Sequence, residues 1–258
     1  MADRYFARAG AAARLGSLAF LCLLFLRPAC AETRVLLTLE WPPYTSVKEP
    51  GGGTVTSLVN QVFKDMGDET RVGYFSWHRV LQLPRTDRRF AASYPMYYSD
   101  KRLDRCYFSD PIGEGPVGLA EPKNAPLTWQ RVADLKAWRI GVVRGYVNSP
   151  DFDQRVATGE IQTLAAETDA ENLRNLLAGR VQAAIIDENT FHYMNSHTDT
   201  LIGMEKTLQL NSRLLTVNKV YMCFPKDKAG LALRDRFNHS LRRLNLPLPG
   251  HSERPSAQ

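Results

Sequence analysis

Apolar residues follow two recurring patterns along this chain, helical stripes and short continuous runs. The clearest stripe lies between Thr54 and Gly67, where apolar residues recur at the spacing of one helical face. Apolar runs at residues 35–39 and 71–75 flank this stripe and are typical of strands. The pattern therefore predicts a strand, a helix and a second strand, with Gly67 ending the helix.

Strand and helix patterns continue to alternate through the rest of the chain. Two helices have explicit start signals: Ser149 stands before Pro150, and Thr168 opens a capping box with Glu171. Such alternation favours parallel sheets covered by helices, arranged here as two α/β halves. Further strands are predicted at residues 90–96, 139–143, 161–164, 182–187 and 220–224, with helices at 78–83 and 229–244.

The first 31 residues have the features of a secretory signal peptide. A basic, Ala-rich stretch is followed by an apolar run at residues 17–26 and by the small-residue site Ala29-Cys30-Ala31. Ten residues rise about 15 Å as a helix, half of the roughly 30 Å hydrocarbon core, which disfavours a permanent membrane span. We expect cleavage after Ala31 and export of the remaining chain. The alternative is an uncleaved anchor.

The amino-acid composition indicates a folded protein, and its charge argues against one class of partner, nucleic acids. Apolar residues make up 44% and charged residues 23% of the 258 positions, which excludes a disordered tail and a collagen-like repeat. Three of the six net positive charges lie within residues 1–31, and the remainder is too small to indicate nucleic-acid binding. Two cysteines, Cys106 and Cys223, follow the signal peptide. They can form a disulfide in an oxidising compartment or serve as small core residues.

Motifs for nucleotides, metals and nucleophilic catalysis are weak in this sequence. Gly113, Gly115 and Gly118 match a dinucleotide-binding spacing, but Pro116 removes an N–H donor and residues 117–120 predict a strand. The five histidines and the cysteines form no metal-binding pattern, and no Gly-x-Ser-x-Gly motif occurs. We therefore expect no cofactor and no metal.

Aromatic and basic residues gather where the predicted strands end. Trp41 and Tyr44 follow the first strand, and Trp77 follows the second. Tyr97 and Arg102 follow the third. Ligands of open parallel sheets bind beyond the carboxyl ends of the strands, so these side chains are expected to share a site. Rings offer flat apolar walls and a guanidinium matches a carboxylate, which favours a small organic anion or zwitterion.

Several motifs occur together in a characteristic order. The most specific joins Ser99-Asp100-Lys101-Arg102 to Phe108-Ser109-Asp110-Pro111, which begins six residues after Arg102. The loop Trp41-Pro42-Pro43-Tyr44 and the helix that follows Gly53 are further members of the set. Over residues 34–244, this order resembles the family 3 extracellular solute-binding proteins, the periplasmic receptors of polar amino-acid ABC transporters.

The resemblance implies an α/β fold of the two-lobed type II periplasmic binding protein class. Each lobe would be a mostly parallel sheet flanked by helices. Two crossovers, near residues 118–122 and 217–222, would act as a hinge that closes the lobes on ligand. The implied boundaries are residues 32–118 and 221–246 for lobe 1, 119–220 for lobe 2, and 247–258 for a mobile tail.

The resemblance also implies roles for individual residues. Arg102 would bind the ligand carboxylate, Asp187 would bind an ammonium group, and Trp41 would stack on the ligand body. Tyr146 departs from the family, whose members often carry a small hydroxyl residue after the glycine that corresponds to Gly145. The ligand-binding residues predicted in this way are Trp41, Tyr44, Trp77, Tyr97, Ser99, Arg102, Tyr146 and Asp187.

The function implied is capture of a small amino acid or organic acid in the periplasm by a monomeric receptor. The receptor would deliver its ligand to the permease of an ABC transporter. One alternative is an exported enzyme similar to the cyclohexadienyl dehydratases, which place an acidic glutamate at the position of Asp187. Another is a sensory ligand-binding protein.

Overall fold

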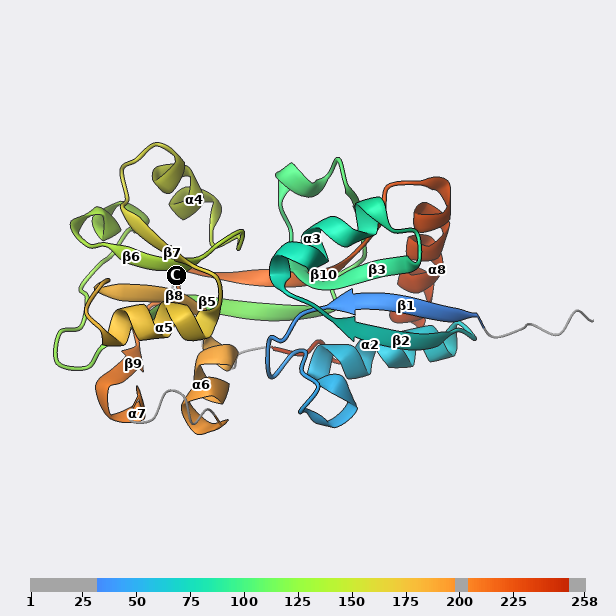
Figure 1. Cartoon of the computed structure of the whole chain (residues 1–258), viewed down its shortest axis with the longest axis horizontal. Helices are drawn as coiled ribbons and strands as arrows, with labels where there is room; N and C mark the ends of the chain where they lie inside the picture. The colour runs from blue at the N-terminus through green and yellow to red at the C-terminus, as the bar shows by residue number, and fades with distance from the viewer. Residues whose placement is uncertain (1–31, 198–203, 251–258) are drawn as a thin grey trace, which may run out of the picture. The chain divides into compact units, whose positions relative to one another are not determined.

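One sheet runs through the computed structural model, which describes residues 32–197 and 204–250 (Figure 1). Its strands are β1 (Thr33–Thr38), β2 (Glu69–Tyr74), β3 (Phe90–Tyr97), β4 (Cys106–Phe108), β5 (Gly113–Pro122), β6 (Ile140–Val143), β7 (Thr163–Ala166), β8 (Ala183–Asp187), β9 (Leu208–Leu210) and β10 (Thr216–Pro225). Their order is β2-β1-β3-β10-β5-β8-β6-β7, with β4 beside β10 and β9 beside β5.

Lobe 1 is built on the three parallel strands β2, β1 and β3. Helix α2 (Thr54–Asp65) buries the apolar stripe predicted from the sequence, and Gly67 follows it with a φ of +80°. Helix α3 (Trp77–Thr86) lies on the other side of the strands (Figure 1). Helix α8 (Lys228–Leu244) packs on α2, where the ring centroids of Phe63 and Phe237 are 5.5 Å apart.

Lobe 2 repeats this arrangement with the parallel strands β7, β6 and β8. Both predicted helix starts are confirmed. The Ser149 side chain accepts the N–H of Phe152 at the start of α4 (Pro150–Ala157), and Thr168 accepts the N–H of Glu171 in α5 (Asp169–Leu177). Strand β7 begins two residues later than the predicted run, because residues 161 and 162 lead into the strand from the turn after α4.

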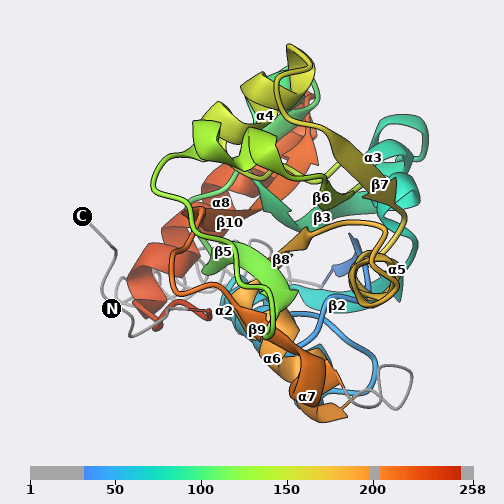
Figure 2. The same ribbon diagram turned by 90° about the vertical axis from the view of Figure 1, so that its left-hand side faces the viewer.

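Three further elements of lobe 2 were not predicted from the sequence. They are α6 (Glu188–His197), α7 (Met204–Thr207) and β9. Figure 2 shows all three on the side of the lobe away from α4. Helix α6 follows β8 directly, so the end of that strand and the start of the helix form one continuous turn.

Strands β5 and β10 run antiparallel to each other and connect the two lobes. Strand β10 pairs with β3 in lobe 1, and β5 pairs with β8 in lobe 2. Gly113, Gly115 and Gly118 all lie inside β5. The mostly parallel sheet expected for each lobe is therefore bordered by one long antiparallel strand, and the α/β, two-lobed fold class is confirmed. The lobe boundaries themselves stay a prediction.

The predicted signal peptide, residues 1–31, and residues 251–258 of the predicted tail lie outside the described residues. The start of the tail is held in place, because the Pro249 carbonyl accepts the Glu114 N–H at 2.8 Å and the Gly250 carbonyl accepts Nδ2 of Asn189 at 3.2 Å. Across the described ranges, no helix combines the length and apolar character of a membrane span.

Cys106 and Cys223 form a disulfide, with their Cα atoms 5.0 Å apart. The bond joins β4 to β10 and closes a loop across 117 positions of sequence. The choice between a disulfide and two core cysteines, which the sequence left open, is thereby decided.

We predict that the double substitution Cys106→Ser and Cys223→Ser lowers the free energy of unfolding by about 2–5 kcal/mol. The disulfide closes a long loop and so restricts the unfolded chain, and the substitution removes this restriction. Urea denaturation of both proteins, with and without reductant, measures this difference. Reductant should destabilise the parent protein and leave the double variant unchanged. Equal unfolding midpoints for the two oxidised proteins would contradict a stabilising disulfide.

Candidate functional site

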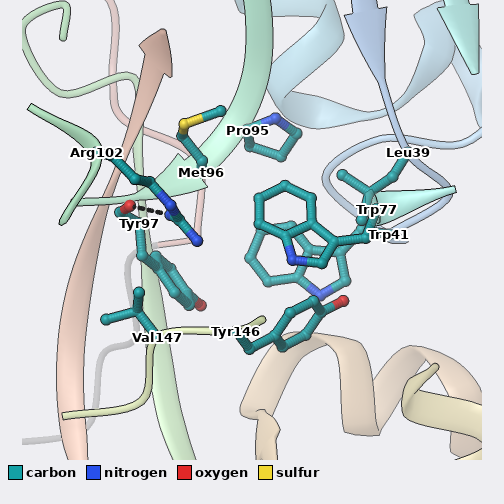
Figure 3. A pocket seen from close by; sticks show the side chains of 9 residues that line it. All are labelled: Leu39, Trp41, Trp77, Pro95, Met96, Tyr97, Arg102, Tyr146 and Val147. Carbon is teal, nitrogen blue, oxygen red and sulfur yellow. Dashed lines mark hydrogen bonds between the residues drawn. The ribbon is translucent and has the colours of Figure 1, made fainter. Parts of the chain in front are cut away.

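A small pocket lies where the ends of β1 and β3 face the loop that follows β6 (Figure 3). Its volume is about 20 Å³, the space of roughly one water molecule. The side chains that surround the pocket therefore leave little free space inside it. The pocket is lined by Leu39, Trp41, Trp77, Pro95, Met96, Tyr97, Arg102, Tyr146 and Val147.

Four aromatic side chains line the pocket, three from lobe 1 and Tyr146 from lobe 2. Strand β1 ends at Thr38, and the tight turn that contains Pro42 and Pro43 begins at Trp41, which is 5% exposed. The Trp41 ring lies 4.5 Å from that of Tyr44 and edge-on to Tyr97 at 5.6 Å. Trp77, the first residue of α3, meets Tyr146 of lobe 2 edge-on at 5.8 Å. The wall is thus flat and apolar on several sides.

Arg102 contributes the positive charge of the pocket. It ends a 3-10 helix at Asp100–Arg102, which turns its side chain back across the end of β3. Its Nη1 donates to the Tyr97 carbonyl at 2.7 Å, and Nη2 donates to the Gly145 carbonyl of lobe 2 at 3.1 Å. The guanidinium also lies over the Trp77 ring at 5.3 Å.

The Arg102 guanidinium is buried without a counter-charge. The residue is 9% exposed, and among the described residues no carboxylate forms an ion pair with it. Burial lowers the pKa of Arg102 to about 10, so the group remains protonated at neutral pH. An uncompensated buried cation is unfavourable, and an anion placed beside it would relieve that cost.

Asp187 lies at the end of β8 and does not line the pocket. Tyr97, which does line it, contacts the Asp187 carboxyl through its hydroxyl, so Asp187 is behind the Tyr97 ring. Its Oδ1 accepts the N–H of Thr190 at 2.9 Å and so caps α6. Its Oδ2 accepts the hydroxyls of Tyr44 at 3.0 Å and Tyr97 at 3.3 Å, both from lobe 1. Burial raises the pKa of Asp187 to about 7.

Two residues that sequence reasoning did not single out belong to the same region. Asp169 is buried, accepts the Tyr146 hydroxyl at 3.1 Å, and has its pKa raised to about 6 by burial. Asn189 donates from Nδ2 to the Tyr44 hydroxyl at 2.8 Å. In the sequence, Asp169 directly follows the helix cap Thr168, where an acidic residue is common, so nothing marked it as a candidate site residue. Asn189 lies 145 positions from Tyr44, so no local pattern indicates their contact.

A larger groove of about 740 Å³ adjoins the pocket. It runs between residues 98–106 of lobe 1 and residues 145–157 of lobe 2. Ser99 lines this groove rather than the small pocket, and its carbonyl accepts the Arg102 N–H at 2.9 Å. Four residues, Met96, Arg102, Tyr146 and Val147, line both spaces, so the pocket and the groove share one wall.

The eight predicted ligand-binding residues therefore fall into three places. Trp41, Trp77, Tyr97, Arg102 and Tyr146 line the pocket. Tyr44 and Asp187 lie together behind Tyr97, and Ser99 lies in the groove. Their roles toward a ligand stay predictions. Within residues 32–197 and 204–250, no cluster of His, Cys, Asp and Glu could hold a metal ion.

Comparisons with known proteins identify the fold. A scan against protein-family models gives no match, and neither does a search of curated proteins. Among solved structures, a histidine kinase sensor domain with similarity to periplasmic binding proteins is 18% identical, with a TM-score of 0.71, over 83% of this chain and 91% of that chain.

Two further structures support the same conclusion. Holo ArgBP from T. maritima is 16% identical over 83% of this chain and 90% of that chain, with a TM-score of 0.66. The substrate-binding protein of an amino acid ABC transporter is 16% identical over 83% and 93%, with a TM-score of 0.64. At these identities the similarity establishes the fold of periplasmic binding proteins.

The buried carboxyls predict a pH dependence of stability. Unfolded Asp residues titrate near about pH 4, whereas the pKa of Asp187 is about 7 and that of Asp169 is about 6 in the fold. Between these values the folded protein keeps protons that the unfolded chain has released. Their stabilising effect is therefore complete below about pH 4 and is lost as the pH rises through 7.

We predict that the unfolding free energy falls between pH 5 and pH 8 and that Asp187→Asn reduces this fall. Asparagine keeps an acceptor for the Thr190 N–H but cannot ionise. Asp104→Asn, which removes a 68% exposed carboxylate, serves as the control and should retain the parent slope. Urea denaturation at several pH values measures the slopes. Identical slopes for the parent protein and Asp187→Asn would contradict the prediction.

Proposed function

We propose that this protein, which has the two-lobed fold of periplasmic binding proteins, captures a small carboxylate-bearing molecule between its lobes. The observation that carries the proposal is the buried Arg102 guanidinium, which has no acidic partner among the described residues. Two of its five N–H groups bond to backbone carbonyls, and the others are available to a ligand. A planar guanidinium binds a carboxylate through two parallel hydrogen bonds, a geometry that it also offers to phosphate, and the apolar walls of the pocket favour the less strongly hydrated carboxylate of a small organic molecule.

Closure of the lobes completes the proposed site. The Gly145 carbonyl of lobe 2 lies 3.1 Å from Nη2 of Arg102 in lobe 1, so opening the hinge would break this bond. The 20 Å³ pocket is too small for an amino acid or organic acid. Ligand entry therefore requires the lobes to separate, and reclosure around the ligand follows the hinge mechanism of this fold.

The proposed setting is the periplasm, with delivery to the permease of an ABC transporter by a monomeric protein. The basic, apolar and small-residue pattern of residues 1–31 supports export. The fold is shared with the substrate-binding protein of an amino acid ABC transporter, which supports transport. It is shared equally with a histidine kinase sensor domain, so ligand sensing is the second candidate. Both functions require the same capture step.

We predict that Arg102→Ala abolishes capture while the protein still folds. Truncating one partner of a buried charge pair costs about 2–5 kcal/mol, which is a loss of at least tenfold in affinity. Arg88→Ala, whose side chain is 93% exposed, is the matched control and should bind as the parent protein does.

A thermal-shift screen of amino acids and small organic acids, followed by calorimetry, measures the effect. A ligand at a hundred times its dissociation constant stabilises the parent protein by about 2.7 kcal/mol. Unchanged affinity in Arg102→Ala would remove this residue from the site. A screen in which no carboxylate binds the parent protein would refute the proposed capture.

An exported dehydratase remains the enzymatic candidate, and the raised pKa of Asp187 favours it because general acids need a proton near neutral pH. Three hydrogen-bond donors already occupy the Asp187 carboxyl, which opposes that role. We predict that the protein does not convert prephenate or arogenate. Absorbance of the aromatised products measures turnover, and product formation that disappears in Asp187→Asn would establish the enzyme instead.

A further inference from the structure

The pocket presents hydrogen-bond donors from three side chains of lobe 1. Besides Arg102, the indole Nε1 atoms of Trp41 and Trp77 are buried, and neither has a hydrogen-bond partner within the described part of the chain. An indole N–H can only donate. Buried donors are almost always paired in folded proteins, so two unpaired indoles in one small pocket require an explanation.

Gly145 of lobe 2 lies close to two of these donors, the Trp77 indole and the Arg102 guanidinium. A Cβ atom placed on Gly145 would lie 3.3 Å from Nε1 of Trp77, and the carbonyl of the same residue accepts Nη2 of Arg102. Opening the hinge would withdraw Gly145 and leave the guanidinium and the Trp77 N–H facing the same space. A ligand oxygen in that space would be within reach of both donors.

The nearby carboxyl groups are engaged in other contacts. The Asp187 carboxyl accepts hydrogen bonds from the Thr190 N–H and from the hydroxyls of Tyr44 and Tyr97. The Tyr97 side chain separates it from Arg102, which bonds to the Tyr97 carbonyl. Asp169 receives the Tyr146 hydroxyl. Neither carboxyl lines the pocket. An ammonium group could reach Asp187 only by displacing tyrosine hydroxyls that hold the lobes together.

The electrostatics agree with this geometry. Burial raises the pKa of Asp187 to about 7, so this carboxyl carries only part of its negative charge near neutral pH. Arg102 keeps its full positive charge under the same conditions. The closed site is therefore more positive than a site built for a zwitterion, which would offer one ionised group of each sign.

We infer that the ligand is a carboxylate that bears no ammonium group and has an apolar body, held by Arg102 and by the indole N–H groups of Trp41 and Trp77. This inference rests on the proposed capture of a carboxylate and narrows the class of ligand. The apolar body follows from the walls, because Leu39, Met96 and Val147 complete the aromatic enclosure.

Three pairs of compounds that differ only in the ammonium group test the inference. They are 3-phenylpropanoate with L-phenylalanine, glutarate with L-glutamate, and 5-guanidinopentanoate with L-arginine. Calorimetry uses the protein purified after expression of the full chain. We expect the acid to bind at least tenfold more tightly than its amino acid in every pair that binds, with 3-phenylpropanoate the tightest of the six.

Conservative variants test the donors. Trp41→Phe and Trp77→Phe keep a ring but remove the N–H, and each should weaken binding of 3-phenylpropanoate about three- to tenfold. Trp138→Phe, at a half-buried tryptophan outside the pocket, is the matched control and should leave the affinity unchanged. Full affinity in both indole variants would remove these groups from the site.

The outcomes separate this inference from the proposed function. An amino acid that binds through Arg102 as tightly as its matched acid, and that loses more than tenfold in Asp187→Asn, would overturn the inference and leave carboxylate capture intact. Absence of binding by all six compounds at 10 mM, or binding that Arg102→Ala does not change, would refute both.

Discussion

The burial of one guanidinium between two lobes is the constraint on which the site depends. Arg102 ends the 3-10 helix that follows β3, bonds to the Tyr97 carbonyl of its own lobe, and reaches across to the Gly145 carbonyl of the other. A charge in this position is tolerated because backbone carbonyls and the Trp77 ring surround it. These neutral groups do not neutralise the guanidinium charge. An anionic ligand is therefore the kind of molecule that the pocket would bind most favourably.

A second network holds the lobes together without entering the pocket. The Asp187 carboxyl caps α6 within lobe 2 and accepts the hydroxyls of Tyr44 and Tyr97 from lobe 1, while Asn189 donates to Tyr44 from the opposite side. The hydrogen bonds of Tyr44 and Tyr97 cross from lobe 1 to lobe 2, whereas the cap of α6 lies within lobe 2. The contacts between the lobes thus include a cationic one at the pocket and a carboxyl-centred one at the end of β8, and Tyr97 takes part in both.

The sequence predicted those features that local patterns encode. The stripe of α2, the caps at Ser149 and Thr168, and the aromatic and basic residues after β1 and β3 all follow from spacing and side-chain chemistry. Asp187 illustrates what could not be predicted. Its position three residues before Thr190 suits a helix cap, which the sequence analysis did not use, and its role toward a ligand stays a prediction. Its tyrosine partners lie 90 and 143 positions away, where only the fold brings them close.

The central proposal is that Arg102 binds the anionic group of a ligand between the lobes. A crystal structure of the protein with the tightest carboxylate from the screen tests that claim most directly. The account predicts closed lobes and a ligand carboxylate about 2.7–2.9 Å from the nitrogen atoms of the Arg102 guanidinium. A carboxylate bound elsewhere in the cleft, with Arg102 still bonded only to the carbonyls of Tyr97 and Gly145, would contradict it.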